Sequence, residues 1–229
     1  MGKVIFFQSF LLLRIQDDKL NKTMKIITRA TAIKNLKKYI GQDLRKLAME
    51  HRITTYETGK QNKGWKGHIL EILAGLQTSS SKQPNGITFE LKSVSFRYVK
   101  GILVPKETMA ITMVNPNELK DHDFFNSHCW DKLKAIIFCA VHWHGQNVPR
   151  AELLKVFNFD LDAKDNIVLE IKQDYDLIRN KLIEHGFEAL TGKDGKWIQA
   201  RTKGAGHGST SRAFYARTGL VKVIFDSAK

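Results

Sequence analysis

The chain has 229 residues, 42% of them hydrophobic and 26% charged, which is the balance of an ordinary soluble globular protein. Its two cysteines, Cys129 and Cys139, exclude a disulfide framework and suit a reducing cytoplasm. The net charge of +14, from 37 Lys+Arg against 23 Asp+Glu, favours a polyanionic partner, most commonly a nucleic acid, over a merely basic surface.

The N-terminal segment MGKVIFFQSFLLLRIQDDKLNK is the one ambiguous targeting signal. Gln8 and Ser9 interrupt its apolar run, no small-residue cleavage site follows, and the run is too short to span a bilayer. The myristoylation pattern fails because position 6 is Phe6. We therefore expect residues 1–30 to form an N-terminal extension, with neither secretion nor membrane insertion.

The hydrophobic periodicity predicts helices and strands along the rest of the chain. In chain order they are basic helices over 31–40 and 42–51, a largely buried helix over 64–76, strands over 87–96, 107–114 and 134–143, an amphipathic helix over 171–186, and late strands over 196–201 and 212–217. The strand over 134–143 is strongly apolar, which predicts a central place in a sheet. This order indicates a mixed α/β domain.

A Glu-x-Lys pair lies on the strand over 87–96. Side chains alternate along a strand, so Glu90 and Lys92 share one face, about 7 Å apart. Such a pair can reach one phosphate, where Mg²⁺ held by oxygen ligands activates water and a lysine stabilises developing charge. Taken alone the pattern favours a solvated strand face, because Glu-x-Lys is common by chance.

The surrounding motifs are more specific than this pair. In chain order they are KGWKGHILE, ITFELK, KETMAITMVNP, FFNSHCWDKLKAIIF, QARTKG and SRAFYAR. Together they resemble the MutH-like endonuclease family, which comprises mismatch-repair MutH and related type II restriction endonucleases in the PD-(D/E)XK nuclease superfamily. The resemblance runs from about residue 31 to about residue 225. It implies an α/β, PD-(D/E)XK restriction-endonuclease-like fold, with a central mixed sheet flanked by helices, over residues 31–229.

The resemblance also implies a set of site residues. The catalytic positions are Glu71, Asn85, Glu90, Lys92 and Lys132. Mg²⁺ would be held at positions 85 and 90, while Glu71 and Lys132 would support the site. Two plainer interpretations stay open, since Glu71 can be a core glutamate with a satisfied partner and Lys132 a solvated lysine at the start of a strand.

Asn85 departs from the family pattern. The family has an aspartate 14 residues after the helix glutamate, and the same count from Glu71 reaches Asn85. No other acidic residue lies between Glu71 and Glu90, so a chain with a neutral amide here is expected to bind DNA and cut it poorly. Either an aspartate was replaced to trap a substrate complex, or the chain is a naturally inactive homologue. Pro84-Asn85-Gly86 is also a common turn sequence.

Basic and aromatic residues are concentrated near the C-terminus, on both sides of a glycine-rich stretch. The resemblance places the DNA-reading region here. The residues expected to bind DNA are Arg201, Lys203, Arg212 and Tyr215. Phosphate contacts from such a patch give affinity, whereas an arginine or aromatic side chain at a base edge gives specificity. The alternative is a basic surface without a partner.

Two other patterns carry weaker signals. His142 and His144 share a strand face, but a zinc site needs further ligands of suitable spacing, which favours ordinary core or surface histidines. The glycine-rich segment KGAGHGS lacks the Gly-Lys-Ser/Thr signature of a nucleotide-binding loop.

The sequence therefore predicts a cytoplasmic bacterial or archaeal enzyme that hydrolyses phosphodiester bonds of double-stranded DNA with Mg²⁺, first of all a type II restriction endonuclease. A mismatch-repair nicking enzyme is the nearest alternative, although the loop before Glu90 is two residues shorter than in the MutH pattern. A non-catalytic DNA-binding protein and a basic RNA-binding protein are the alternatives from other classes. Both a monomer and a homodimer fit a chain of this size.

Overall fold

The structure is a computed structural model that describes residues 27–53, 56–57, 60–62, 64–76, 88–145, 150–203 and 211–228. Most of the expected N-terminal extension, Asn85 and the glycine-rich segment lie outside the described residues. No helix in the described part of the chain combines the length and the apolarity that crossing a bilayer requires.

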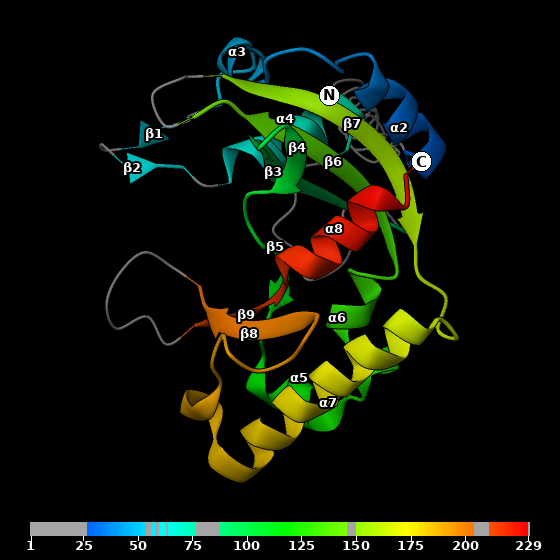
Figure 1. Ribbon diagram of the computed structural model, residues 1–229, viewed down its shortest axis with the longest axis vertical. Coiled ribbons are helices and arrows are strands. Elements are labelled where there is room, and N and C mark those ends of the chain that lie inside the picture. The colour runs from blue at the N-terminus through cyan, green and yellow to red at the C-terminus, as the bar shows by residue number, and fades with distance from the viewer. Residues whose placement is uncertain are drawn as a thin grey trace, which may run out of the picture.

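A four-stranded main sheet forms the upper part of the molecule (Figure 1). Its strands are β4 (Ile102–Pro105), β3 (Glu90–Val99), β6 (Ala135–Trp143) and β7 (Ala151–Asp160), in that spatial order. β3 and β6 are parallel, whereas β4 and β7 pair antiparallel to their neighbours. The sheet is therefore mixed, and β6 is an interior strand, as its apolar run predicts.

Three helices cover one face of the main sheet (Figure 1): α2 (Arg29–Lys37), α3 (Leu44–Glu50) and α4 (Trp65–Ala74). Between α3 and α4 the short strands β1 (Tyr56–Glu57) and β2 (Lys60–Gln61) pair with each other. The apolar side chains of α4 pack with Leu91 and Ile137 of the sheet. α4 ends where Gly75 adopts a φ of 82°, a left-handed conformation that glycine reaches without strain.

A second, three-stranded sheet lies below the first and is called here the small sheet (Figure 1). Its antiparallel strands are β5 (Met109–Met113), β9 (Arg212–Ala216) and β8 (Ile198–Thr202). Around it lie α5 (Pro116–Asp121), α6 (His128–Asp131), α7 (Asn166–His185) and the 3₁₀ turns η1 (Phe124–Asn126) and η2 (Phe187–Ala189). α8 (Thr218–Asp226) contacts β4 of the main sheet and β9 of the small sheet, so it joins the two.

Asp174 on α7 fixes the start of β8 in the small sheet. Its buried carboxylate accepts backbone N–H groups from Lys196, Trp197 and Ile198 at 2.7, 2.5 and 2.9 Å. The chain reaches these donors through Gly195, whose φ is +80° and where a Cβ would lie 2.1 Å from the Ile198 carbonyl oxygen. A glycine is therefore required at this position.

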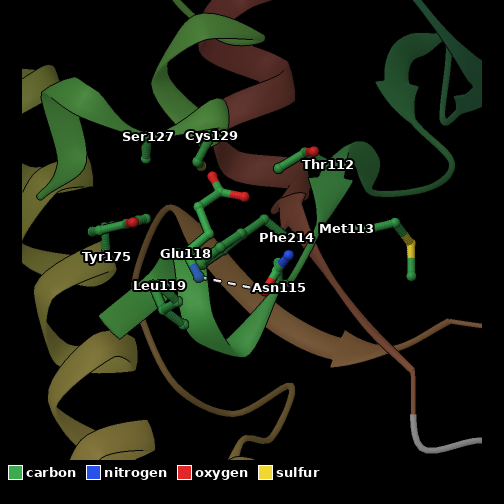
Figure 2. Close-up of a pocket in the computed structure, with 9 residues that line it drawn as sticks. All are labelled: Thr112, Met113, Asn115, Glu118, Leu119, Ser127, Cys129, Tyr175 and Phe214. Atoms are coloured by element: carbon green, nitrogen blue, oxygen red, sulfur yellow. Dashed lines mark hydrogen bonds between the residues drawn. The ribbon is translucent and has the colours of Figure 1, made fainter. Parts of the chain in front are cut away.

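A small pocket lies between β5, β9 and the helices α5, α6 and α7, and Figure 2 shows the side chains that line it. Asn115 caps α5 by accepting the Glu118 N–H at 3.4 Å. The Glu118 carboxylate pairs with His128, at 2.6 Å from its Nδ1 and 3.0 Å from its backbone nitrogen. Burial raises the pKa of both Cys129 and Tyr175, which keeps these groups neutral, and the pocket is best understood as part of the packing.

The observed fold confirms the predicted class, a mixed sheet flanked by helices, and differs from the predicted elements in places. The strand expected over 87–96 begins at Glu90 and runs to Val99. β7 and α8 were not predicted as elements. The late strands lie where the periodicity placed them, whereas the long helix, expected over 171–186, begins earlier, at Asn166.

Candidate active site

Glu90 opens β3 and is 4% exposed. Its Oε1 lies 2.9 Å from the Nζ of Lys92 on the same strand. The same oxygen lies 3.5 Å from the Nζ of Lys132, which follows α6 in the chain and precedes β6. All three side chains are nearly enclosed, so this pattern is not the solvated strand face that a chance Glu-x-Lys pair would form. We call Glu90, Lys92 and Lys132 the Glu90 cluster.

Lys92 also joins the main sheet to the small sheet. Its Nζ donates to the carbonyl oxygen of Ile111 at 2.9 Å. Ile111 lies at an irregularity in the pairing of β5 with β9, between Ala110 and Thr112. A bulge releases a residue from the ladder and re-aims its groups, which is why bulges are common beside active sites. This carbonyl and the Glu90 carboxylate thus both orient the Lys92 ammonium.

Among the described residues, the Glu90 carboxylate pairs with two ammonium groups, so positive charge gathers at the cluster. Burial lowers the pKa of Lys92, the nearby cations Lys132 and Lys203 lower it further, and Glu90 opposes the shift. Lys203 follows β8 and is exposed, so the end of the small sheet brings another positive charge toward the cluster. Excess positive charge in a partly enclosed site favours an anionic group such as a phosphate.

The described residues do not by themselves complete a Mg²⁺ site. Mg²⁺ prefers several oxygen ligands, usually including one or two carboxylates. Among the described residues, no group of three or more His, Cys, Asp or Glu donors includes Glu90. Glu90 fits as one ligand, and the second predicted position, Asn85, lies outside the described residues and has no charge to offer.

Glu71 lies on α4 and is partly buried. α4 covers the face of the main sheet that carries Leu91, whereas Glu90 and Lys92 alternate to the other face. The supporting role of Glu71 remains a prediction.

A neighbouring cluster was not predicted from the sequence. Lys66 of α4 donates to the Ser95 hydroxyl of β3 and lies 3.1 Å from Oε1 of Glu107, which precedes β5. The same Glu107 oxygen accepts the Ser95 N–H at 3.1 Å. These contacts tie α4 to the strand that carries Glu90. Lys66 and Glu107 belong to the motifs quoted above, but their contact joins distant segments and gives no local signal.

The expected DNA-binding residues lie on or next to β8 and β9, and they have different environments. Arg201 is exposed, and its guanidinium lies 4.8 Å from the ring centroid of Tyr215. Such stacking holds an arginine in place and leaves its donors available to a ligand. Lys203 is exposed, and its backbone N–H donates to the carbonyl oxygen of Ser211, the residue before β9.

Arg212 differs from this expectation, because it is 8% exposed and its guanidinium bonds within the protein. Its Nε donates to the Leu190 carbonyl at 2.9 Å, and Nη2 reaches Glu188 at 3.3 Å. The sequence could have indicated this burial, because alternation along β9 places Arg212 on the same face as the buried Phe214. Arg212 is better placed to position the small sheet than to contact a ligand directly.

A carboxylate between two lysines on a mixed, helix-flanked sheet defines an α/β protein with the layout expected of PD-(D/E)XK-like enzymes. Comparison with known proteins shows which family the chain resembles. The sequence model described as DNA mismatch repair enzyme MutH matches residues 75–174. The DNA mismatch repair protein MutH of Escherichia coli O17:K52:H18 (strain UMN026) is 24% identical over 179 residues, covering 77% of this chain and 76% of that protein.

The protein of the same name from Shigella boydii serotype 18 is 25% identical over 185 residues, with the same 77% and 76% coverage. The chain is therefore MutH-like, which confirms its resemblance to the MutH-like endonuclease family. The matched range 75–174 includes all three residues of the Glu90 cluster and stops short of both Glu71 and Arg201.

Proposed function

We propose that this chain is a MutH-like endonuclease that binds double-stranded DNA and hydrolyses its phosphodiester bonds with Mg²⁺, in its active form with an aspartate at position 85. The observation that carries the proposal is the enclosed Glu90 carboxylate between the ammonium groups of Lys92 and Lys132. That arrangement stands on the strand where the family resemblance expects the site.

Each residue of the cluster has a role in this proposal. Glu90 would hold the metal together with the residue at position 85. A bound Mg²⁺ would polarise the scissile phosphate and lower the pKa of a bound water. Lys92, oriented by Glu90 and the Ile111 carbonyl, would stabilise charge that develops on the phosphate. Lys132 would add a second positive charge. With the neutral Asn85 the metal site is incomplete, so the chain as written is expected to bind DNA and cut it slowly.

The DNA would lie across the small sheet and reach the Glu90 cluster. Arg201 and Lys203 are exposed on or next to β8, and Lys203 lies near enough to influence Lys92. Exposed cations of this kind exchange counterions for phosphates and give salt-dependent affinity. The net charge of +14 acts in the same direction.

A sequence-specific type II restriction endonuclease is the first specific form of this proposal. The shortened segment between Glu71 and Glu90 supports it, because it departs from the MutH pattern. A mismatch-repair nicking enzyme is the second form, and the relatives support it, since they carry the name DNA mismatch repair protein MutH.

The test is a cleavage assay with the Asn85→Asp variant. We expect it to cut plasmid and viral DNA of known sequence in the presence of Mg²⁺, with no cutting in EDTA and much slower cutting by the parent chain. Discrete double-strand fragments identify a restriction enzyme, and nicked circles that need a repair activator identify a nicking enzyme. The double variant Asn85→Asp/Lys92→Met is the matched control, since it has the aspartate and lacks the ammonium.

Intact DNA with Asn85→Asp, combined with tight duplex binding, would replace the proposal with a non-catalytic DNA-binding protein. Equal affinity for RNA and DNA duplexes, without dependence on sequence, would point instead to a basic RNA-binding protein.

A further inference from the structure

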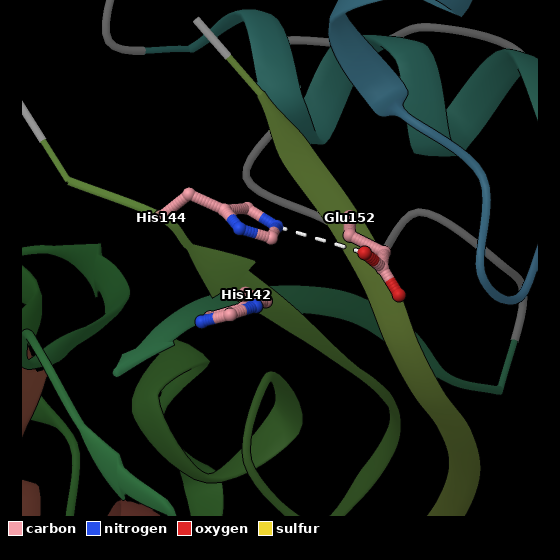
Figure 3. A group of neighbouring side chains, drawn as sticks. All are labelled: His142, His144 and Glu152. Carbon is pink, nitrogen blue, oxygen red and sulfur yellow. Dashed lines mark ion pairs between the residues drawn. The ribbon is translucent and has the colours of Figure 1, made fainter. Parts of the chain in front are cut away.

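A second group of possible metal ligands lies at the other end of the main sheet. His142 ends β6 together with Trp143, His144 follows directly, and Glu152 lies on β7. One ligand atom from each of these three residues lies within 4.8 Å of the other two, and all three residues are partly buried. Figure 3 shows the two imidazole rings and the carboxylate side by side at the strand ends.

The fold brings together residues that the sequence keeps apart. His142 and Glu152 are direct partners in the antiparallel pairing of β6 with β7. His144 is two residues beyond His142, so alternation turns it to the same side, and the two ring centroids are 3.9 Å apart. The third ligand that the local sequence pattern lacks is therefore supplied by the neighbouring strand.

The polar contacts of the group leave donor atoms available. The Nε2 of His144 is buried and has no hydrogen-bond partner among the described residues, and it faces Oε2 of Glu152 at 3.6 Å. That oxygen also accepts a hydrogen bond from Arg150 at 2.8 Å, which leaves the other carboxylate oxygen free of this contact. The ring of Tyr98 packs edge-on against His142 with centroids 5.2 Å apart. A buried imidazole nitrogen without a partner is costly unless something occupies it.

This group is distinct from the Glu90 cluster. In the parallel pairing of β3 with β6, Glu90 pairs with Ile136 and Phe96 pairs with His142. The histidines thus lie six residues further along the sheet, about 20 Å at the rise of a strand. The donor chemistry differs as well, because imidazole nitrogens suit zinc, nickel and copper, whereas carboxylate oxygens suit Mg²⁺.

We propose that His142, His144 and Glu152 bind one borderline divalent transition-metal ion of the zinc class. Two imidazoles and a carboxylate are a common protein ligand set for such an ion, with a further coordination position open to water. Arg150 orients the carboxylate from outside, as partners of metal ligands commonly do. The bound ion fastens the end of β6 to β7. This proposal does not depend on the nuclease function.

The test measures Zn²⁺ binding by the untagged full chain with excess Mg²⁺ present. Titration calorimetry and metal analysis after dialysis are the two measurements. We expect His144→Gln and Glu152→Gln each to weaken the binding of one Zn²⁺ by at least about tenfold. Co²⁺ in place of Zn²⁺ should give visible absorption bands that both variants lose. Zn²⁺ should also raise the Tm of the parent chain and leave that of His144→Gln unchanged.

His185→Gln is the matched control, because its Nε2 also lies 3.6 Å from a glutamate, Glu184, on an exposed part of α7. We expect this variant to bind Zn²⁺ as the parent does. Equal Zn²⁺ binding by the parent, His144→Gln and Glu152→Gln would overturn the proposal, and so would the absence of binding by a folded parent chain. Circular dichroism without metal shows that each variant is folded, and cleavage by the Asn85→Asp chain is scored separately.

Discussion

The Glu90 cluster and the surface of β8 and β9 both gather positive charge, but the two regions compensate it differently. In the cluster, Lys92 and Lys132 are nearly enclosed and share one carboxylate oxygen. On the small sheet, Arg201 is exposed and rests on the ring of Tyr215. Enclosed cations act on one reacting group, where the low dielectric strengthens them, whereas exposed cations exchange counterions along a duplex. Cleavage and binding should therefore be separable by mutation.

The largest expected effect is that of Glu90→Gln in the Asn85→Asp background. The change removes the predicted metal ligand and leaves two ammonium groups without their carboxylate. We expect cleavage to fall by at least about 100-fold, in the range known for the loss of a preorganised electrostatic group. DNA affinity should hold or rise, because a negative charge has been removed. Plasmid cleavage and a gel-shift titration measure the two effects.

Glu184→Gln, which neutralises an exposed carboxylate on α7, is the control for charge alone. If Glu90→Gln lowered DNA affinity as strongly as it lowered cleavage, the separation between the two regions would be wrong.

Asp174→Asn tests what supports the binding region. The variant loses the charge that accepts three backbone N–H groups at the start of β8. We expect a loss of about 3 kcal/mol in the free energy of unfolding, since hydrogen bonds to charged groups are worth about 1.5–3 kcal/mol each and the amide can still accept some of them. Urea unfolding measures it. Asp176→Asn, two residues on, is the matched control, because its pair with Lys172 is surface-exposed and worth less than about 1 kcal/mol.

Arg201→Ala and Arg212→Ala sharpen the comparison within the small sheet. Arg201→Ala should weaken duplex binding by about tenfold and leave the Tm unchanged. It should also reduce the slope of log affinity against log salt concentration by about one. Arg212→Ala should lower stability by about 1–3 kcal/mol, because the Leu190 carbonyl loses its donor. Fluorescence anisotropy across a salt series and thermal unfolding measure the pair. A stable Arg212→Ala variant with lost DNA affinity would make Arg212 a direct DNA contact after all.

Much of the fold follows from local patterns. The apolar run over 134–143 predicted the interior strand β6, and Gly75 ends α4 where the periodicity stops. β7 was missed because the consecutive Leu153 and Leu154 break the apolar alternation, and the pairing of β7 with β6 is irregular at this point, opposite Ala140 and Val141. α8 was missed because no side chain caps its start.

The candidate site was predictable only in part. Glu90 and Lys92 are two residues apart, so alternation places them together, and the family resemblance added Lys132. The contact of Lys66 with Glu107 and the carbonyl of Ile111 depend on packing between segments distant in the sequence. The same holds for Glu152, whose approach to His142 depends on the pairing of β6 with β7. Local periodicity has no access to such contacts.

The smallest expected effect concerns Glu107, which links α4 to the strand of the Glu90 cluster. Burial raises the pKa of Glu107, but Lys66 and the hydrogen bonds from Ser95 and Lys66 outweigh it and hold the pKa below its ordinary 4.5. A carboxyl group whose pKa is lower in the folded state stabilises the fold above its unfolded pKa and loses that contribution as the pH falls through the folded value. Glu107→Gln should therefore be less stable than the parent at pH 6, and the difference should shrink below about pH 4.5.

Because the Glu107 side chain is 43% exposed, solvent screens its pair with Lys66 and the difference at pH 6 should be below about 1 kcal/mol. Urea unfolding of both chains at several pH values between 6 and 3 measures it, and exposed Glu184→Gln provides the control. Parallel stability curves for the parent and Glu107→Gln would show that Lys66 and Ser95 do not act through this carboxylate. If the two stability curves converge at low pH and DNA affinity is unchanged, Glu107 supports the Glu90 cluster and is not part of the DNA-binding surface.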